Sequence, residues 1–379
     1  MILFIGTEPP SEQRVALTPQ VAGRLTALGI DVRVPSGVGR TLHLDDESYR
    51  QAGASVVAES APAMAEADVV VRLNGPKRAE VAAMKPGSVL VSFLDPFRNP
   101  ELVAALADHR VSSLCMELIP RSTYAQKMDA LSSQASLAGY AAVILAADRI
   151  DKAIPMMSTP AGTIAPARVF VVGVGVAGLQ AIATAKRLGA RVEAYDTRPV
   201  VEEQVKSLGA RFVKIDVGET GQTEQGYAKA LSEEQLELQR QQMGRFCANA
   251  DIVITTAQVF GRPAPRIITA EMVAGMRPGS VIVDLAASTG GNVEGTVADQ
   301  DVEVGGVLIL GLANMPGLVA RDASQVYSAN VANLIEHAFD SESGRLALDP
   351  ADDVIGSCLL SHDGQVRHDQ IRALVEAAA

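Results

Sequence analysis

The sequence has few of the residues that several classes of protein depend on. Its 379 residues contain no tryptophan, 4% aromatic residues and three cysteines. Cys115, Cys247 and Cys358 lie far apart, which matches no metal-binding pattern and is typical of reduced thiols in a cytosolic protein. Lysine and arginine are scattered and outnumbered, 33 against 44 acidic residues, for a net charge of −11. Neither nucleic-acid binding nor a polybasic membrane anchor is therefore expected.

Long hydrophobic runs are also missing. The longest clean apolar run, Leu137 to Ala147, is too short to cross a bilayer, and the first residues turn polar too soon for a secretory signal. We expect no direct membrane insertion, so any membrane role needs a partner. Histidine offers no obvious catalytic base, because none of the five lies in a segment that looks like a site loop. They are His43, His109, His337, His362 and His368.

One dense motif occupies residues 169–198, VFVVGVGVAGLQAIATAKRLGARVEAYDTR. A β-branched run predicts a buried parallel strand, three glycines interrupt it, and an Ala/Leu-rich helical pattern follows before a second strand delivers Asp196. This is G-x-G-x-x-G in the strand, turn, helix, strand and acid context that dinucleotide binding requires. Gly173 would allow the turn, Gly175 the approach of a pyrophosphate, and Gly178 the close packing of helix on strand.

Asp196 is expected to accept hydrogen bonds from the adenosine ribose hydroxyls and to repel a 2′-phosphate, which favours NAD(H) over NADP(H). Arg198 leaves the alternative open, because an arginine near this position can accept that phosphate instead. The candidate nucleotide contacts in this stretch of the sequence and beyond it are Gly173, Gly175, Val176, Ala177, Gly178, Asp196, Thr197, Arg198 and Ala257.

Length and pattern predict an α/β protein of two doubly wound, Rossmann-like domains. The first, residues 1–133 plus 330–379, alternates strand and helix without a glycine-rich phosphate loop. The second, residues 134–329, carries the glycine motif, and NAD(H) is expected in the cleft between the domains at the carboxyl ends of the parallel strands. A long Ala/Leu/Ser helix at about Asp129–Ile150 connects the domains, and a helix at Ala323–Phe339 returns the chain.

Apolar runs between turn signals predict the strands of both sheets. The expected strands are Met1–Gly6, Ile30–Val34, Ala67–Arg72, Val89–Phe93 and Val111–Met116 in the first domain, and Val169–Val172, Arg191–Tyr195, Arg211–Ile215, Asp251–Thr255, Ser280–Leu285 and Val307–Gly311 in the second.

Four stretches carry a resemblance to a known family. They are EQRVALTP, MELIPRSTYAQKMDALSSQASLAGY, VGVGVAGLQAIATAKRLGARVEAYDTRPVVEEQVKSLGA and DIVITTAQVFGRPAPRIITAEMV. Together they resemble the NAD(H)-binding first domain of proton-translocating nicotinamide nucleotide transhydrogenase, in its separate α-subunit form, and more distantly alanine dehydrogenase. The resemblance spans essentially the whole chain, and its second stretch is the most specific.

The resemblance implies that a loop in the second stretch holds the nicotinamide ring of NAD(H), through Arg121, Gln126, Asp129 and Ser132. The chemistry is plausible from the residues alone, because an amide side chain can fix the carboxamide and Arg121 can pair with Asp129 or turn toward the pyrophosphate. The alternative is an ordinary capped turn before a helix, with Arg121 and Asp129 as a solvated ion pair.

The resemblance also implies a mobile loop at residues 218–226 that closes over the nucleotide, with Tyr227 touching the adenosine part; the alternative is a loop tyrosine without a ligand. It further implies direct hydride transfer to NADP(H) on a membrane-bound partner subunit, coupled to proton translocation there. The chain would then be a homodimer held at the cytoplasmic face of the inner membrane by its partners. Residues 131–150 and the apolar strands of the second domain are the candidate dimer interface.

An alanine dehydrogenase is the rival interpretation. Arg14 could be its substrate arginine, but Arg72 fills the lysine position, Asp95 the histidine position and Ser288 the aspartate position of that family's pattern. A keto acid must gain a proton as it gains hydride, so these replacements remove the means. Transfer between two nicotinamide rings needs no such base. A module that only senses NAD(H) is the other alternative. Ser288 and Gly317 depart from the transhydrogenase pattern.

Overall fold

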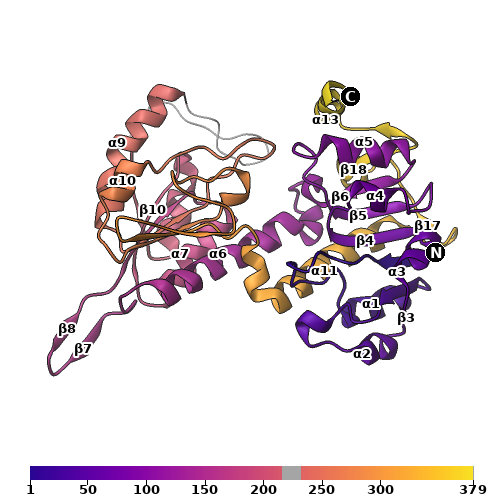
Figure 1. Ribbon diagram of the computed structural model, residues 1–379, viewed down its shortest axis with the longest axis horizontal. Helices are drawn as coiled ribbons and strands as arrows, with labels where there is room; N and C mark the ends of the chain where they lie inside the picture. Colours follow the sequence, from indigo (N-terminus) through magenta and orange to yellow (C-terminus); the bar gives the residue numbers. More distant parts are fainter. Residues whose placement is uncertain (216–231, 379) are drawn as a thin grey trace. The chain divides into compact units, whose positions relative to one another are not determined.

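The computed structural model describes residues 1–215 and 232–378, which form two compact units (Figure 1). Unit 1 consists of Met1–Gln134 and Gly317–Ala379, and unit 2 of Ala135–Pro316. Each unit is a mixed α/β body built on a largely parallel sheet, which confirms the predicted fold class.

The chain returns to unit 1 at Gly317, earlier than the expected residue 330. The reason is the long helix α11 (Ala320–Ala338), which packs in the core of unit 1. Its Ser324 and Ser328 hydroxyls accept hydrogen bonds from the backbone N–H groups of Val15 and Thr18 at 2.9 and 3.0 Å. The whole helix therefore belongs to the first unit.

The sheet of unit 1 has the order β19-β18-β6-β5-β4-β1-β2-β3. Six strands are parallel, and the last two run antiparallel at one edge. The parallel part has the 3-2-1-4-5-6 order of a doubly wound fold, with its switch point between β1 and β4. The strands are β1 (Ile2–Ile5), β2 (Asp31–Pro35), β3 (Ser55–Val57), β4 (Val69–Asn74), β5 (Val89–Phe93), β6 (Ser112–Cys115), β18 (Leu359–His362) and β19 (Gln365–Val366).

Alternate residues of each unit 1 strand enter different cores, as the pleat requires. In β1, Leu3 and Ile5 pack with α11 and α12, whereas Phe4 packs on the opposite face with α5 and α13. The helices of unit 1 are α1 (Pro19–Thr26), α2 (Asp46–Gln51), α3 (Ser60–Glu66), α4 (Arg78–Val81), α5 (Pro100–Asp108), α11, α12 (Asp353–Cys358) and α13 (Asp369–Ala378). A small hairpin joins β16 (Phe339–Asp340) to β17 (Arg345–Leu346).

The sheet of unit 2 has the order β11-β10-β9-β12-β13-β15-β14, parallel except for β14. This repeats the 3-2-1-4-5-6 order and places the switch point between β9 and β12. The strands are β9 (Arg168–Val172), β10 (Arg191–Tyr195), β11 (Arg211–Phe212), β12 (Ile252–Thr255), β13 (Val281–Asp284), β14 (Asp301–Val304) and β15 (Val307–Leu310).

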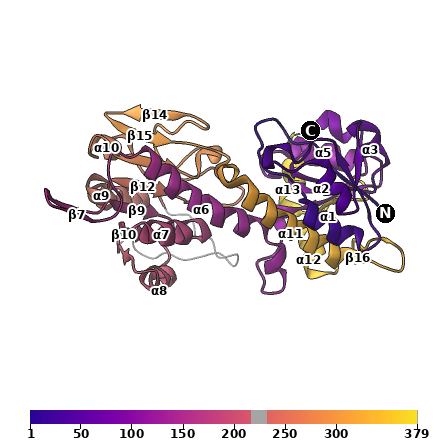
Figure 2. The same ribbon diagram turned by 90° about the horizontal axis from the view of Figure 1, so that it is seen from below.

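Helices cover both faces of the unit 2 sheet (Figure 2). One face carries α6 (Ala130–Arg149), of which the unit holds all but the first turn, and α7 (Val176–Arg187). The other carries α9 (Glu233–Asn249) and α10 (Ala270–Ala274). A short α8 (Glu202–Ser207) follows β10, and a hairpin of β7 (Met157–Thr159) and β8 (Gly162–Ile164) projects from the unit (Figure 1).

Helix α6 is long and apolar enough to cross a membrane by length and composition alone, and it is the single helix of this kind in the described residues of the chain. Four of its residues, Ala141, Ala142, Val143 and Ala146, lie in the core of unit 2. A buried core helix passes the same test, so one such helix is weak evidence of membrane insertion.

The packing of α6 on α7 depends on Gly139. A methyl group added there would overlap the carbonyl oxygen of Ala177. We predict that Gly139→Ala forces the two helices apart and lowers the free energy of unfolding by roughly 2–4 kcal/mol. Gly244→Ala in α9 is the matched control, because its added methyl would meet nothing nearer than Met272 at 3.8 Å. The control should be neutral or stabilising by up to about 1 kcal/mol. Denaturant unfolding followed by circular dichroism measures both, and equal effects would contradict the packing argument.

Candidate functional site

The glycine motif forms a tight turn between β9 and α7. Gly173 has φ of +95°, a left-handed conformation in which a side chain would be strained, and its added Cβ would lie 2.6 Å from the Thr256 hydroxyl oxygen. At Gly178 an added Cβ would overlap the carbonyl oxygen of Gly173. Both glycines are thus required by the fold itself, as the sequence predicted.

Gly175 differs from the other two. It is the N-cap of α7, and a Cβ placed there would meet no protein atom within 4 Å. Packing therefore does not explain the glycine, whereas the approach of a ligand to the backbone does. The N–H groups of Val176, Ala177 and Gly178 open the helix, where intrahelical partners are lacking and the helix dipole favours an anion. This cradle fits the pyrophosphate of a dinucleotide.

Asp196 stands at the carboxyl end of β10, beside the turn. Its Oδ2 accepts a hydrogen bond from the backbone N–H of Val174 at 2.7 Å. Both carboxylate oxygens also bind the guanidinium of Arg198, and the two side chains are only 6% and 13% exposed. The hydrogen bond to Asp196 raises the pKa of Arg198 further above its ordinary value, although burial opposes this. Thr197, half-buried, links the two residues.

The opposite wall of the turn is the segment after β12. The hydroxyl of Thr256 donates to the carbonyl of Gly173 at 3.0 Å. Its neighbour Ala257 is fixed by Asn292, whose side chain accepts from the N–H of Ala257 at 3.0 Å and donates to its carbonyl at 2.8 Å. Asn292 is held in turn by Asp284, which accepts its backbone N–H at 2.8 Å.

Sequence reasoning missed Asp284 and Asn292 as supports of this wall. Asp284 is fully buried and accepts five hydrogen bonds, from the N–H groups of Ala286, Asn292 and Val293 and the hydroxyls of Thr255 and Thr296. A buried charge of this kind is expected only where donors surround it. An aspartate ending the apolar strand VIVD was the available signal.

The candidate nicotinamide loop lies in unit 1, between β6 and α6. Arg121 and Gln126 are exposed, the latter in a 3-10 turn (Ala125–Met128). Asp129 is buried and caps α6: it accepts the backbone N–H of Ser132 at 2.9 Å and the hydroxyl of Ser132 at 2.5 Å. The expected capped turn is therefore present, and it brings Asp129 and Ser132 into direct contact.

Helix α11 anchors this loop from below. The side chains of Asn330 and Asn333 both donate to the carbonyl of Lys127 at 2.9 Å. The hydroxyl of Tyr124 lies 3.1 Å from Nδ1 of His337, whose Nε2 lies 2.9 Å from Asp352. His337 was placed outside the site loops by sequence, and the structure instead brings it against one of them.

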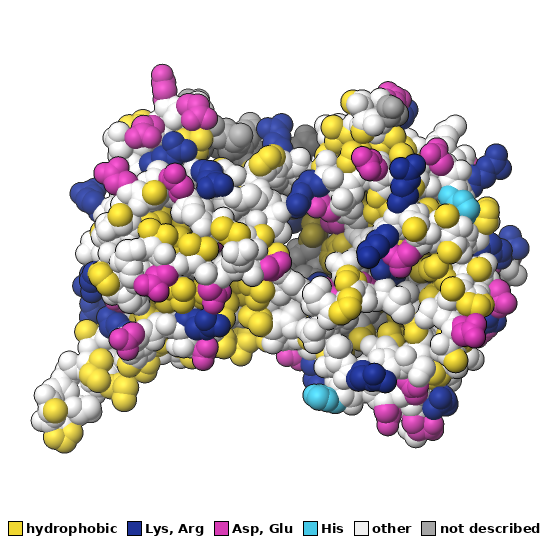
Figure 3. Space-filling model, viewed as in Figure 1, with side chains coloured by type: hydrophobic (Ala, Val, Ile, Leu, Met, Phe, Trp, Pro, Cys, Tyr) yellow, Lys and Arg dark blue, Asp and Glu magenta, His cyan; other side chains and the backbone are white. Residues whose placement is uncertain are grey.

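Tyr227, expected to touch the adenosine part, lies outside the described residues, as does the polar segment 218–226. Among the residues that the structure describes, no cluster of His, Cys, Asp or Glu could hold a metal ion. On the face shown in Figure 3, charges of both signs are interspersed, as the composition suggested.

The positions relevant to an amino-acid dehydrogenase are occupied by internal ion pairs. Arg14 is buried and binds Glu12 at 2.7 Å and Gln134 at 2.8 Å. Arg72 is buried and binds Glu80 at 2.9 Å. Both arginines thus have structural partners inside unit 1.

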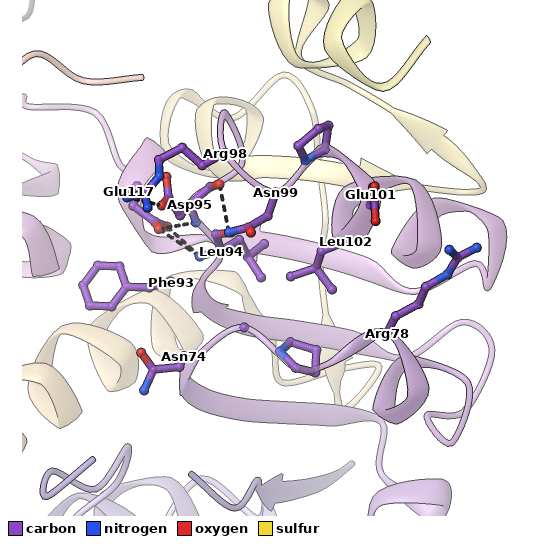
Figure 4. Close-up of a pocket in the computed structure, with 13 residues that line it drawn as sticks. Asn74, Arg78, Phe93, Leu94, Asp95, Arg98, Asn99, Glu101, Leu102 and Glu117 are labelled. Atoms are coloured by element: carbon purple, nitrogen blue, oxygen red, sulfur yellow. Dashed lines mark hydrogen bonds and ion pairs between the residues drawn. The ribbon is translucent and has the colours of Figure 1, made fainter. Parts of the chain in front are cut away.

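Asp95, at the expected histidine position, lines a cavity of about 760 Å³ beside the ends of β4 and β5 (Figure 4). It has φ of +44° and pairs with Arg98 at 3.2 Å. The carboxylate of Glu117 accepts the N–H groups of Leu94 and Asp95 at 2.8 and 2.7 Å, and burial raises its pKa despite these bonds. None of the thirteen described residues lining the cavity is histidine or lysine.

Comparisons with known proteins agree with this organisation. The models for the N-terminal and C-terminal domains of alanine dehydrogenase/PNT match residues 5–138 and 142–369. The chain is 43% identical over 366 residues to the first of the polypeptides that make up NAD(P) transhydrogenase subunit alpha in Rhodospirillum rubrum, covering 95% of each. It resembles the crystal structure of transhydrogenase from Sinorhizobium meliloti with a TM-score of 0.85 and 42% identity, covering 98% and 100%. An L-alanine dehydrogenase structure, at 24% identity and a TM-score of 0.79 over 99% and 100%, shares the fold.

The buried pair of Glu12 and Arg14 gives unit 1 a defined acid sensitivity. Burial disfavours the charged carboxylate, but the hydrogen bonds and charge of Arg14 outweigh it and lower the pKa of Glu12 from 4.5 to about 2. Ionised Glu12 therefore stabilises the fold above pH 4.5, and this contribution disappears as the pH falls toward 2. It corresponds to about 3 kcal/mol at neutral pH.

We predict that Glu12→Gln is destabilising at pH 7 and that its deficit against the unsubstituted chain shrinks between pH 5 and pH 2. Glu8→Gln is the control with opposite sign, because burial raises the pKa of Glu8 and its ionisation works against folding as the pH rises. Urea unfolding at a series of pH values measures both differences. A Glu12→Gln deficit that does not change with pH would show that the carboxylate charge is not the stabilising element.

Proposed function

The chain belongs to the alanine dehydrogenase/PNT family and, within it, to the α subunits of NAD(P) transhydrogenases, and from this premise we propose that it is the NAD(H)-binding subunit of such an enzyme. The single observation that carries the proposal is the turn of unit 2. Its Gly175 leaves open space at the backbone where the other two glycines are tightly packed. We propose that the pyrophosphate binds over Gly175, Val176, Ala177 and Gly178.

The remaining nucleotide contacts follow from the same turn. Asp196 and Arg198 flank the position where the adenosine ribose would lie, with Thr197 between them. Ala257, held by Asn292, forms the opposite wall. We propose Tyr227 as a further contact with the adenosine part on family resemblance alone.

For the nicotinamide end we propose the loop that bears Arg121, Gln126, Asp129 and Ser132. Its geometry supports this role because Gln126 and Arg121 are exposed, whereas Asp129 and Ser132 form a fixed cap beneath them. A loop anchored by α11 keeps its exposed side chains in defined positions, which ring placement requires. An amide can hold the carboxamide, and a guanidinium can bind phosphate or carboxylate.

The proposed reaction moves one hydride from the reduced nicotinamide ring of one nucleotide to the oxidised ring of the other, so NADPH and NAD⁺ give NADP⁺ and NADH, or the reverse. Two electrons and one proton travel together, and no proton is exchanged with a side chain. The chain's task is to position one ring and to exclude water from it. NADP(H) would be held by a partner subunit.

An alanine dehydrogenase activity is disfavoured by the ion pairs of Arg14 and Arg72 and by Asp95 at the expected histidine position. A keto acid would need both a clamp and an acid in that place. A sensor of NAD(H) without chemistry is the second candidate, and the transfer assay below separates it from a subunit.

We further propose a homodimer, carried on the cytoplasmic face of the inner membrane by membrane-bound partner subunits. Partly exposed apolar side chains on α6, Tyr140 and Ile144 at 39% each, support the helix as part of the dimer interface. Light scattering at micromolar concentration should give twice the chain mass. A monomer under these conditions would contradict the dimer and leave the nucleotide site unaffected.

The nicotinamide loop yields the decisive test. We predict that Gln126→Asn and Asp129→Asn each slow hydride transfer roughly tenfold or more, while NADH affinity changes only a few-fold. The reason is that ring placement matters most in the transition state, whereas the turn of unit 2 supplies much of the binding. Asparagine can still cap a helix, so Asp129→Asn tests the charge without removing the cap.

The measurement mixes this chain with an NADP(H)-binding partner domain and follows reduction of an NAD analogue by NADPH. Lys127→Ala is the matched control, because its side chain is exposed in the same turn and only its carbonyl is bonded by α11. NADH binding without any transfer by the unsubstituted chain would favour a sensor. Pyruvate-dependent oxidation of NADH by this chain alone would favour an amino-acid dehydrogenase.

A further inference from the structure

The pair of Asp196 and Arg198 has a role in nucleotide choice that the carboxylate alone does not explain. Four donors bind the Asp196 carboxylate: the N–H of Val174 at 2.7 Å, and the backbone N–H, Nε and a terminal nitrogen of Arg198 at 2.9, 2.9 and 2.8 Å. An ionised carboxylate offers about four lone-pair sites. Three of the four donors belong to one residue, so Arg198 competes directly with any ribose hydroxyl.

The pair is tied to the glycine turn on both sides. While Val174 donates its N–H to Asp196, its carbonyl accepts from the guanidinium of Arg198 at 3.1 Å. Val174 lies between Gly173 and Gly175, so the guanidinium is held at the place where the adenosine ribose would meet the turn. An ordinary surface pair has no such connection. Glu193 and Arg211, on the neighbouring strands β10 and β11, form one at 2.9 Å with Arg211 largely exposed.

Charge makes the arrangement ambiguous for a nucleotide. A carboxylate at this position repels a 2′-phosphate, but here a guanidinium of opposite charge neutralises it. The planar guanidinium fork matches phosphate oxygens and binds them with strong, charge-assisted hydrogen bonds. The preference for one nucleotide therefore depends on which partner engages Arg198.

We propose that Arg198 is a reserve receptor for the 2′-phosphate of NADP(H), held out of use by Asp196, so that the ion pair as a unit determines nucleotide choice. Resting on the proposed function, the inference concerns how the same site selects its nucleotide. In the unsubstituted chain Asp196 retains the guanidinium, and a ribose hydroxyl can replace one of its donors. Without Asp196 the guanidinium loses its counter-ion beside the turn and becomes available to a phosphate.

The experiment compares the binding of NADH and NADPH, and of the fragments 5′-AMP and 2′,5′-ADP, by calorimetry. The proteins are the unsubstituted chain, Asp196→Ala, Asp196→Asn, Arg198→Ala and the double variant Asp196→Ala/Arg198→Ala. We expect Asp196→Ala to bind 2′,5′-ADP about tenfold more tightly than the unsubstituted chain, and the double variant to lose this gain. Arg198→Ala should retain NADH and bind NADPH no better than before.

Two further readouts identify the guanidinium as the cause. The gain in Asp196→Ala should weaken with added salt, and it should weaken below about pH 6, where the phosphate loses part of its charge. Glu193→Ala and Arg211→Ala are matched controls that remove one charge of either sign from the same sheet edge. Neither should change the ratio of the two fragment affinities.

The outcomes separate this inference from the proposed function. If Asp196→Ala or the isosteric Asp196→Asn still binds 5′-AMP but gains nothing for 2′,5′-ADP, the reserve receptor is wrong and the NAD(H) site stands. A gain that persists in the double variant would also overturn it, because another group must then hold the phosphate. If the unsubstituted chain binds neither NADH nor 5′-AMP, the proposed function itself fails.

Discussion

The contact between the backbone of α7 and the turn at Gly173 is the constraint on which the nucleotide site depends. Because Gly178 has no side chain, the helix begins directly above the Gly173 carbonyl, and its first N–H groups face the space that Gly175 leaves open. Asp196 and Arg198 then close one side of the turn, and Thr256 with Ala257 the other. Each of these contacts presupposes the same approach of helix to strand, so one missing methyl group orders the whole arrangement.

The two units show why a fold alone does not make a nucleotide site. Both sheets have the doubly wound order, and both therefore have a switch point. In unit 1 that edge is filled from within: Glu8 accepts the N–H groups of Leu73 and Asn74, and the side chain of Arg72 lies where a Cβ of Gly6 would stand. In unit 2 the corresponding edge has glycines and open backbone. The chemistry follows these residues, and the shared topology only offers the location.

Sequence patterns predicted much of this structure where one short segment carries the whole signal. The motif at residues 169–198 specified the order β9, turn, α7, β10, and α6 was expected within a residue of its observed ends. The strands β3, β14, β18 and β19 were not anticipated, because short edge strands have weak apolar patterns. The supports Asp284 and Asn292, and His337 under the nicotinamide loop, depend on contacts between distant segments that periodicity does not report. Arg198 was noticed in the sequence, but only geometry joins it to Asp196 through three hydrogen bonds.

The discontinuous make-up of unit 1 has a consequence for how the chain folds during synthesis. Unit 2 is a single uninterrupted segment, so every contact of its sheet is available once Pro316 has left the ribosome. Unit 1 must wait, because α11 fills its core and β18 pairs with β6 across almost 250 residues of intervening chain. The unit that is second in sequence can thus be the first to fold. The earlier half of unit 1 then spends that interval with an apolar face uncovered, which makes this stage of synthesis the one most exposed to aggregation and most dependent on chaperones.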